Sequence, residues 1–545
     1  MPKMTGGQAI VRSLLDHGVT TVFGIPGIQL DNLYDAFYER RNNLRVIHTR
    51  HEQGAAFMAM GYAQASGDTG VFAVVPGPGL LNSLTALATA ASANLPVLGL
   101  TGQIPSYQIG QNYGMAHELK DQLAVSRGII DWVARAEHPS EVPALLCDAF
   151  RDMHSGRKSP AILEMAPDLL GAAAAVEPIA PVTPRSAPEP EADLIKQAAE
   201  RLYSARRPLI LVGGGIVDAE APLRAVAEHL GAPVAMSPNA RGSLGDAHPL
   251  AFEMLGGQEL WDQADVALIV GTRYTTTALA WGREAEVETI RIDVDPTQIV
   301  KPRRSDVEIV AAAGPALEAL ARALAKRGPA RQAPADEHAA VHGEIAAKMA
   351  DLEPLSGYGR AFREALPDDA MVFADVTRFS VFTRFGVPFY CPRSFFMPGF
   401  QATLGWAYPA ALGGKVAAPE RKTVAIMGDG GFMFTVQELA TAMHHDIPVT
   451  VLVFDNKAYG NVKTIQANRY GGRHIAVDLT NPDFVALAQS FGMAADRVEA
   501  PDQLAEVLGR HLAADRPSLI EVGMPDAPNV WSLVRRPPSQ GQVRG

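Results

Sequence analysis

The chain has 545 residues, which is too long for a single hydrophobic core, so we expect two to four domains. Apolar residues make up 47% of the sequence and charged residues 20%, and the net charge of −11 argues against nucleic-acid or anionic-membrane partners. With only Cys147 and Cys391, a disulfide framework and a cysteine-based zinc site are excluded. No segment reads as a signal peptide or a membrane span, which predicts a cytoplasmic protein.

Short apolar runs alternate with helical patterns along the whole chain, which is typical of parallel-sheet α/β units. Two stretches rich in Ala, Pro and charged residues divide the chain into three predicted domains, at 1–171, 190–330 and 345–530. The predicted strands are Val19–Gly24, Leu44–His48, Gly70–Val75, Val97–Thr101, Ala161–Met165, Pro208–Val212, Pro233–Ala235, Val266–Val270, Glu288–Ile292, Met371–Ala374, Val424–Met427, Val449–Phe454 and Ser518–Val522. We therefore predict three doubly wound parallel-sheet domains, and little regular structure after Pro525.

In the first domain, the segment Arg50-His51-Glu52-Gln53-Gly54 follows a predicted strand and opens a helix. Small and apolar residues follow Glu52, so its carboxylate is expected to be partly buried and to need a partner. Taken alone, Glu52 is more simply explained as a helix N-terminal acid that complements the helix dipole.

In the third domain, Val424–Met427 runs into Gly428-Asp429-Gly430-Gly431, and Val449–Phe454 ends on Asp455-Asn456. Ligands bind at the carboxyl ends of parallel strands, and glycines there let the backbone approach a phosphate. Two oxygen-bearing side chains beside a diphosphate suit Mg²⁺ or Ca²⁺. The alternative, a tight turn and a helix cap, explains each element alone but not the pair.

These segments resemble a known family. Asn456 follows Asp429 by 27 residues, and this GDG…Asn pattern resembles the thiamine-diphosphate-binding motif. The segments VFGIPG, RHEQGAA and PGPGLLN of the first domain are similar to the pyrimidine-binding domain of acetolactate-synthase-like and benzoylformate-decarboxylase-like enzymes. The resemblance covers nearly the whole chain. It implies a pyrimidine-binding first domain, a central Rossmann-like domain and a diphosphate-binding third domain.

The resemblance also implies roles for single residues. Glu52 would hydrogen-bond the aminopyrimidine ring of thiamine diphosphate and activate it. Side chains of Asp429 and Asn456, with the carbonyl of Ala458, would hold Mg²⁺, and Leu404 would sit under the cofactor. The further implied cofactor-binding residues are Pro26, Gly77, Asn82, Thr377, Ala402, Gly428, Gly430, Gly431 and Tyr459.

Three departures from the synthase pattern concern the substrate side. Asn461 and Ile465 replace the family's Met and Trp, which removes a wall of the acceptor pocket and adds a polar group. His117 replaces the family's Gln; its pKa range suits proton transfer, although a lone His is more often structural. Gln29 stands where small residues are usual, and we predict that it faces the substrate.

The central domain keeps a Gly213-Gly214-Gly215 turn, but Met254-Leu255-Gly256-Gly257 lacks the fuller flavin-loop pattern. We therefore favour a central domain that binds no nucleotide. Binding of FAD or of an ADP-type nucleotide by this domain is the less favoured alternative.

The resemblance implies a carboligase or decarboxylase acting on a 2-keto acid, working as a homodimer or homotetramer with the site at the subunit interface. A carbon–carbon lyase or hydrolase, or a 2-hydroxyacyl-CoA-type lyase, is the alternative on the same scaffold. A non-catalytic paralogue that binds thiamine diphosphate or a nucleotide is the alternative from another class.

Overall fold

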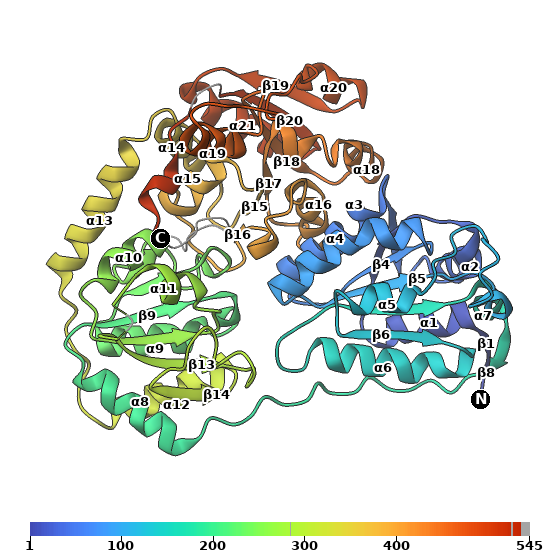
Figure 1. The fold of residues 1–545 in the computed structure, drawn as a ribbon, viewed down its shortest axis with the longest axis horizontal. Helices are drawn as coiled ribbons and strands as arrows, with labels where there is room; N and C mark the ends of the chain where they lie inside the picture. The colour runs from blue at the N-terminus through green and yellow to red at the C-terminus, as the bar shows by residue number, and fades with distance from the viewer. Residues whose placement is uncertain (284, 525–526, 536–545) are drawn as a thin grey trace.

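The structure is a computed structural model that describes residues 1–283, 285–524 and 527–535. Three parallel sheets of six strands, each flanked by helices, form three units that the chain visits in order (Figure 1). The predicted α/β class is confirmed. Residues 536–545, part of the tail for which little regular structure is predicted, lie outside the described residues.

The first unit contains the sheet β3-β2-β4-β5-β7-β6 and a short antiparallel pair formed by β1 and β8. Its strands are β1 (Lys3–Thr5), β2 (Thr21–Gly24), β3 (Arg45–His48), β4 (Gly70–Val74), β5 (Val97–Thr101), β6 (Trp132–Ala136), β7 (Ala161–Met165) and β8 (Ala173–Ala175). Its helices are α1 (Gly6–Asp16), η1 (Ile28–Leu30), α2 (Asp31–Glu39), α3 (Glu52–Ser66), α4 (Pro78–Ala93), η2 (Ser106–Gln108), α5 (Gln122–Arg127), η3 (Pro139–Glu141), α6 (Val142–Met153) and α7 (Pro167–Gly171).

The central unit contains the sheet β11-β10-β9-β12-β13-β14. Its strands are β9 (Pro208–Val212), β10 (Val234–Met236), β11 (Ala251–Glu253), β12 (Val266–Val270), β13 (Glu288–Asp293) and β14 (Val307–Val310). Its helices are α8 (Ala192–Ser204), η4 (Gly214–Ile216), α9 (Glu220–Leu230), η5 (Pro238–Ala240), α10 (Met254–Trp261), α11 (Thr275–Ala280) and α12 (Ala313–Ala325). Numbered within the unit, the strand order is 3-2-1-4-5-6, which is the Rossmann order and agrees with the central Rossmann-like domain that the family resemblance implies.

The third unit follows α13 (Ala335–Ala350) and contains the sheet β16-β15-β17-β18-β20-β19. Its strands are β15 (Met371–Ala374), β16 (Phe395–Phe396), β17 (Thr423–Gly428), β18 (Val449–Asp455), β19 (Ala494–Val498) and β20 (Ser518–Gly523). Its helices are α14 (Leu355–Ala365), α15 (Arg378–Gly386), η6 (Gly399–Gln401), α16 (Ala407–Ala417), α17 (Asp429–Phe432), η7 (Val436–Glu438), α18 (Leu439–His445), α19 (Gly460–Tyr470), α20 (Phe484–Ser490), α21 (Pro501–Ala514) and η8 (Val530–Leu533).

The first and third units share one strand order, 2-1-3-4-6-5 when each is numbered within itself. The order reverses between the first and third strands of each unit, namely between β2 and β4 and between β15 and β17. Ligands of open α/β sheets bind outside the carboxyl ends of the strands at this switch point. Each of the two units therefore has one candidate ligand site, which lies at the same position in the same topology.

Sequence patterns identify the inner strands and miss seven strands: β1 and β8, which form the short antiparallel pair, and five strands of the six-stranded sheets, β6, β11, β14, β16 and β19. These five are all edge strands of their sheets. In addition, β6 and β19 are half-exposed along most of their length. An edge strand needs no continuous apolar run, because one side of it has no neighbouring strand. The predicted domain limits of 1–171, 190–330 and 345–530 stay a prediction, and β8 pairs with β1 just beyond the first of them.

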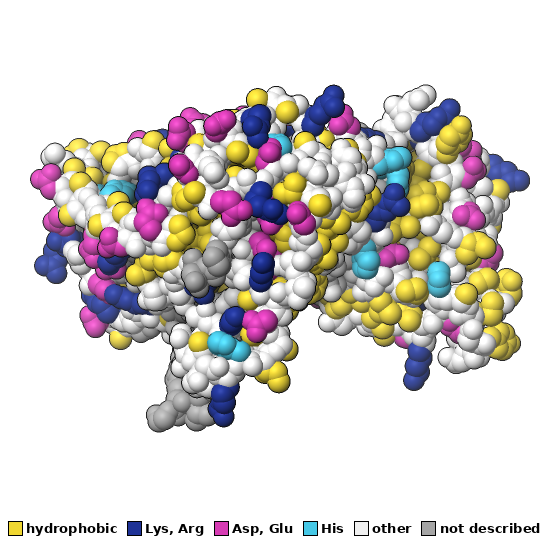
Figure 2. All heavy atoms as spheres, turned by 90° about the horizontal axis from the view of Figure 1, so that it is seen from above, with side chains coloured by type: hydrophobic (Ala, Val, Ile, Leu, Met, Phe, Trp, Pro, Cys, Tyr) yellow, Lys and Arg dark blue, Asp and Glu magenta, His cyan; other side chains and the backbone are white. Residues whose placement is uncertain are grey.

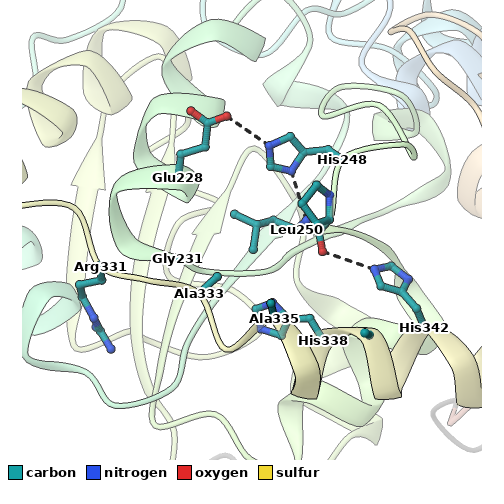
Figure 3. A pocket seen from close by; sticks show the side chains of 11 residues that line it. Glu228, Gly231, His248, Leu250, Arg331, Ala333, Ala335, His338 and His342 are labelled. Atoms are coloured by element: carbon teal, nitrogen blue, oxygen red, sulfur yellow. Dashed lines mark hydrogen bonds and ion pairs between the residues drawn. The ribbon is translucent and has the colours of Figure 1, made fainter.

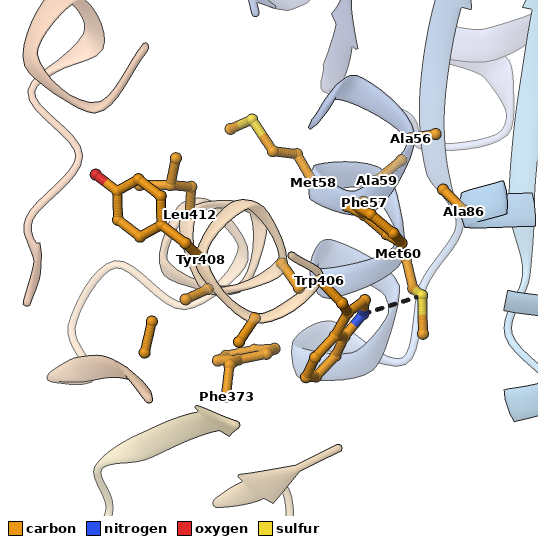
Figure 4. Packing of buried hydrophobic residues seen from close by; sticks show 14 of the residues in the cluster. Ala56, Phe57, Met58, Ala59, Met60, Ala86, Phe373, Trp406, Tyr408 and Leu412 are labelled. Carbon is orange, nitrogen blue, oxygen red and sulfur yellow. Dashed lines mark hydrogen bonds between the residues drawn. The ribbon is translucent and has the colours of Figure 1, made fainter. Parts of the chain in front are cut away.

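The first and third units meet where α3 crosses α16 (Figure 4). Glycines allow this crossing: a methyl group on Gly61 would lie 1.9 Å from the carbonyl oxygen of Ala410, and one on Gly413 would lie 1.8 Å from that of Met58. The indole Nε1 of Trp406 donates to the sulfur of Met60 at 3.3 Å within this apolar core. The helix that begins with Glu52 is thus fixed directly on the third unit.

No helix among the described residues combines the length and apolarity that a membrane crossing requires.

Candidate active site

The switch point of the first unit carries three of the predicted residues. Pro26 follows β2, Gly77 follows β4, and Glu52 is the first residue of α3 after the neighbouring strand β3. The half-exposed carboxylate of Glu52 accepts a hydrogen bond from Nδ2 of Asn82 at 3.0 Å. Gly79 lies directly beneath it, since a methyl group there would lie 3.6 Å from Cγ of Glu52. The fold therefore brings Glu52 and Asn82 together as one polar pair.

The turn at Gly77 connects this pair to His117. Gly77 has φ +59°, and a methyl group there would meet the carbonyl oxygen of His117 at 2.6 Å, so only glycine fits. His117 itself has φ +69°, and its buried Nδ1 has no hydrogen-bond partner among the described residues. The predicted proton-transfer residue thus lies next to the turn that supports the Glu52–Asn82 pair.

Sequence reasoning missed the side chain that holds this turn, Gln122. Its Oε1 accepts from the backbone amide of Gly77 at 3.0 Å, and its Nε2 donates to the carbonyl of Gly102 at 2.9 Å and to buried Glu164 at 2.7 Å. Nothing in the local sequence marks Gln122, because its partners lie on three other segments.

Gln29 is buried, and its Oε1 has no partner among the described residues. Its backbone lies against Gly102, while the adjacent Ile28 is 77% exposed. A substrate-facing role for Gln29 stays a prediction, and the unpaired oxygen is the feature in its favour.

A second missed residue is Glu438, which reaches α3 from the third unit. Its carboxylate accepts from the backbone amides of Arg50 at 3.2 Å and His51 at 3.0 Å, immediately before Glu52, and from the Thr441 hydroxyl at 2.5 Å. Burial raises the pKa of Glu438 to about 7, although these hydrogen bonds oppose the shift. A buried acid of the third unit therefore holds the segment that leads into the helix of Glu52, whose N-cap residue is His51.

The switch point of the third unit gathers two carboxylates and one amide. Asp429 is buried at the end of β17, and Asp455 ends the adjacent strand β18. Nδ2 of Asn481 donates to Asp429 at 2.7 Å and to Asp455 at 2.8 Å. Burial, together with the nearby carboxylate of Asp455, raises the pKa of Asp429. Asn481 was missed because its Asn-Pro-Asp context reads as a turn and a helix cap.

The loop after β18 carries the other predicted metal ligands. Oδ1 of Asn456 accepts from the amide of Ala458 at 3.2 Å, and the carbonyl of Ala458 accepts from the amide of Gly460 at 2.8 Å. The ring of Tyr459 covers Gly430, where a methyl group would lie 2.7 Å from the ring. Asn456, Ala458 and Tyr459 thus lie against the glycine turn that carries Asp429.

Asp375, at the end of β15, fixes the remaining loop of the site. Its carboxylate accepts from the amides of Gly405 and Ala407, both at 2.9 Å, and a methyl group on Gly431 would lie 2.9 Å from it. Burial raises the pKa of Asp375 to about 7. The loop that carries Ala402, with φ +48°, and Leu404 is therefore held beside the glycine turn.

Thr377 lies close to Gly428, with its methyl group 3.4 Å from where a side chain on that glycine would begin. Its hydroxyl caps α15 by accepting from the amide of Ser380 at 3.0 Å. Arg378, the first residue of α15, donates to the carbonyl of Ala527 at 2.6 Å and to the hydroxyl of Thr464 at 2.5 Å. Arg378 therefore ties α15 to α19.

The predicted substrate residues Asn461 and Ile465 lie one turn apart on α19, and both are exposed. Spacing of four residues puts them on one helix face. Because both side chains are exposed, they are accessible to a ligand or to a second subunit.

The glycine turn and its surroundings fit a diphosphate with a hard divalent cation. The available donors are carboxylate, amide and carbonyl oxygens, the set that Mg²⁺ prefers. Gly428, Gly430 and Gly431 lie so close to Thr377, Tyr459 and Asp375 that side chains would fill the cradle. The raised pKa of Asp429 reflects buried carboxylates that a cation would stabilise in their ionised form.

A cavity in the structure lies away from these two switch points. It has a volume of about 360 Å³, lies between the end of α9 and α13 and is lined by His248, His338 and His342 (Figure 3). Because Gly231 follows α9 and precedes β10, this cavity lies at the amino-terminal edge of the central sheet. It is therefore separate from the Gly213–Gly215 turn, where a Rossmann nucleotide would bind.

Comparisons with known proteins agree with this arrangement. Models of the thiamine pyrophosphate enzyme family match all three units: the N-terminal TPP binding domain at residues 4–125, the central domain at 195–320 and the C-terminal TPP binding domain at 375–522. The chain therefore belongs to the thiamine pyrophosphate enzymes, and its cofactor is thiamine diphosphate.

Individual relatives align over nearly their full length. The Pseudomonas aeruginosa protein named "Probable 2-ketoarginine decarboxylase AruI" is 35% identical over 95% of this chain and 94% of its own. The acetolactate synthase isozyme 3 large subunit of Escherichia coli is 32% identical over 94% and 93%. The acetolactate synthase large subunit of Corynebacterium glutamicum is 31% identical over 99% and 90%.

Proposed function

We propose that this enzyme is a Mg²⁺-dependent carboligase or decarboxylase that acts on a 2-keto acid. The observation that carries the proposal is the presence of two half-sites at equivalent switch points, one with Glu52 and one with Asp429. The relatives named as acetolactate synthases and as a 2-ketoarginine decarboxylase support the substrate class.

In this proposal, Asp429, Asn456 and the carbonyl of Ala458 hold Mg²⁺, and Asn481 keeps Asp429 oriented. The amides of Gly430 and Gly431 bind the diphosphate, and Thr377 and Tyr459 border it. When bound, thiamine diphosphate supplies an electron sink for the bond that is broken next to the keto group.

On the other half-site, Glu52 holds a proton between its carboxylate and the aminopyrimidine ring nitrogen, and Asn82 orients that carboxylate. Pro26 and Gly77 shape the pocket. His117 moves a proton at its unpaired Nδ1, and Gln29, Asn461 and Ile465 contact the substrate. Ala402 and Leu404 border the cofactor from the third unit.

We further propose that a homodimer, or a tetramer built from it, completes each site across two chains. Apolar side chains stand exposed beside both half-sites: Leu81 next to Asn82 at 43%, Leu404 at 45%, and Phe434 just after the glycine turn at 49%. Hydrophobic side chains also reach the surface along the junction between the lobe that carries the first sheet, on the right, and the rest of the molecule (Figure 2). A second copy of the chain would bury such surfaces.

We infer that the central unit works without FAD or an ADP-type nucleotide. The Gly213–Gly215 turn packs backbone to backbone on Gly271, with a hydrogen bond of 3.1 Å from Gly215. Asp293, at the end of β13, receives Arg157 of the first unit at 2.8 Å and Arg291 at 3.5 Å. The turn and the acid that would hold a nucleotide are thus engaged by protein groups.

The test is turnover of pyruvate and longer 2-keto acids by the purified chain with thiamine diphosphate and Mg²⁺, with carbon dioxide, aldehyde and ketol products quantified together. Glu52→Gln is expected to lower turnover by about 10²–10⁴-fold, the usual contribution of acid–base catalysis, and to leave cofactor binding intact. Glu39→Gln, on the exposed end of α2, is the control. Wild-type turnover in the Glu52→Gln variant would overturn the assignment.

A further inference from the structure

Three histidines meet at the junction between the first and third units, outside the candidate active site. His48 ends β3, and His444 and His445 form the last turn of α18. Their rings contact one another pairwise, with centroid distances of 4.5 Å for His48–His444 and 4.8 Å for both His48–His445 and His444–His445. None of the three histidines is among the residues proposed to bind the cofactor or the substrate.

The ligand atoms of the three rings converge. One ring nitrogen of each residue can be chosen so that all three lie within 4.8 Å of one another. Nε2 of His445 lies 3.2 Å from Nδ1 of His48. This contact is a hydrogen bond in the structure, and two nitrogens bound to one tetrahedral metal at about 2.0–2.1 Å lie roughly 3.3 Å apart, so an ion that replaced the shared proton would need little change in spacing.

We propose that His48, His444 and His445 form a binding site for a transition-metal ion of the Zn²⁺ class, joining the first unit to the third. Three imidazoles leave a fourth coordination position for water.

The chemistry of the set selects the metal. It contains three imidazole nitrogens and no carboxylate, whereas Mg²⁺ and Ca²⁺ bind through oxygen. Zn²⁺, Ni²⁺ and Cu²⁺ prefer imidazole. The site therefore discriminates against the cation proposed for the Asp429 site.

The surroundings oppose a dication that is held by charge alone. Arg45 donates to the carbonyl of His445 at 3.3 Å, and Arg50 lies near His48. These two charges disfavour any cation held only by electrostatic attraction, so the metal must form strong bonds to nitrogen.

A metal here would brace the approach to the active site. His48 lies four residues before Glu52, and the intervening amides of Arg50 and His51 are the ones that Glu438 accepts. Binding would fix β3 to α18 and, through this segment, the start of α3.

The experiment uses the full-length chain, stripped with chelator and then held in excess Mg²⁺ so that the oxygen site is saturated. Titration with Zn²⁺ followed by calorimetry is expected to show one equivalent bound per chain that Mg²⁺ does not displace. His444→Gln removes an exposed ligand and is expected to weaken binding by at least about 100-fold, because loss of an outer-shell partner alone already costs about 10–100-fold. His474→Gln, an exposed imidazole outside the cluster, is expected to bind like the wild type.

Equal Zn²⁺ binding by the wild type and the His444→Gln variant would overturn the proposal. X-ray absorption spectroscopy of the wild-type protein with bound Zn²⁺ identifies the ligand atoms of the metal even if the variant fails to fold. Three imidazole nitrogens at about 2.0–2.1 Å are expected, and a shell dominated by oxygen would contradict the site.

Discussion

The two half-sites share a topology but differ in what positions them. Asp429 lies at the end of β17, and its partners Asp455 and Asn481 belong to the same unit. Glu52 starts α3, and the acid that holds the segment before this helix, Glu438, comes from another unit nearly 400 residues away in sequence. The proposed metal half-site is therefore formed within one sheet, whereas the proposed acid–base half-site depends on the contact between two units.

This difference predicts different effects of substitutions at the two half-sites. Substitutions of the polar residues at the end of the third sheet should lower cofactor affinity without a change in stability. Substitutions at the α3–α16 junction should lower the stability of the protein and displace Glu52 at the same time.

The largest effect on cofactor binding is expected at Asp429. Asp429→Ala removes a proposed Mg²⁺ ligand, and we expect Mg²⁺-dependent affinity for thiamine diphosphate to fall by more than about 100-fold. Asn481→Ala removes only the amide that orients the carboxylates, and should cost roughly 10–100-fold. Fluorescence titration of cofactor at fixed Mg²⁺ measures both; if both variants kept wild-type affinity, the metal site would lie elsewhere.

The next effect concerns Glu438 and pH. Because burial raises the pKa of Glu438 to about 7, the folded state binds this proton more tightly than the unfolded state, whose carboxyl has its usual pKa near 4.5. The contribution to stability is therefore full below pH about 4.5 and is lost as pH rises to about 7, by roughly 3 kcal/mol.

Glu438→Gln should remove this part of the pH dependence, because glutamine accepts the same amide hydrogen bonds without ionising. Urea unfolding of both proteins between pH 4.5 and 7.5 measures it. Glu506→Gln, exposed on α21, should keep the wild-type slope. Identical slopes for wild type and Glu438→Gln would show that Glu438 does not hold a proton in the folded state.

A smaller effect is expected at the helix crossing. Gly61→Ala puts a methyl group 1.9 Å from the carbonyl oxygen of Ala410, so α3 and α16 must separate, at a cost of about 1–3 kcal/mol. Gly343→Ala in α13 meets nothing within 4 Å and should stabilise the protein by about 0.4–1 kcal/mol. Thermal unfolding compares them; a crossing that tolerates alanine would mean that the units do not pack this closely.

The same contrast explains what the sequence could and could not predict. Apolar runs identify the inner strands, and the residues directly after β17 and β18 meet because neighbouring parallel strands end at one edge. Asn481, Gln122 and Glu438 have no such signal, since their partners lie on distant segments. Edge strands such as β6 and β19 were missed because half-exposed strands need no apolar run.

Arg378 illustrates the limit for a single side chain. Its position after β15 suits a phosphate contact as well as a solvent-facing charge, yet it binds Ala527 and Thr464. The choice depends on where α19 lies, which no local pattern reveals.

The central claim is that one cofactor site combines Glu52 of one chain with Asp429 of another. Mixing the Glu52→Gln and Asp429→Asn proteins, each inactive alone, and allowing subunits to exchange tests it directly. In a hybrid dimer, one site collects both substitutions and the other is intact, so an equal mixture should recover about one quarter of wild-type activity. If exchange is complete and the mixture stays inactive, every site lies within a single chain and the account is wrong.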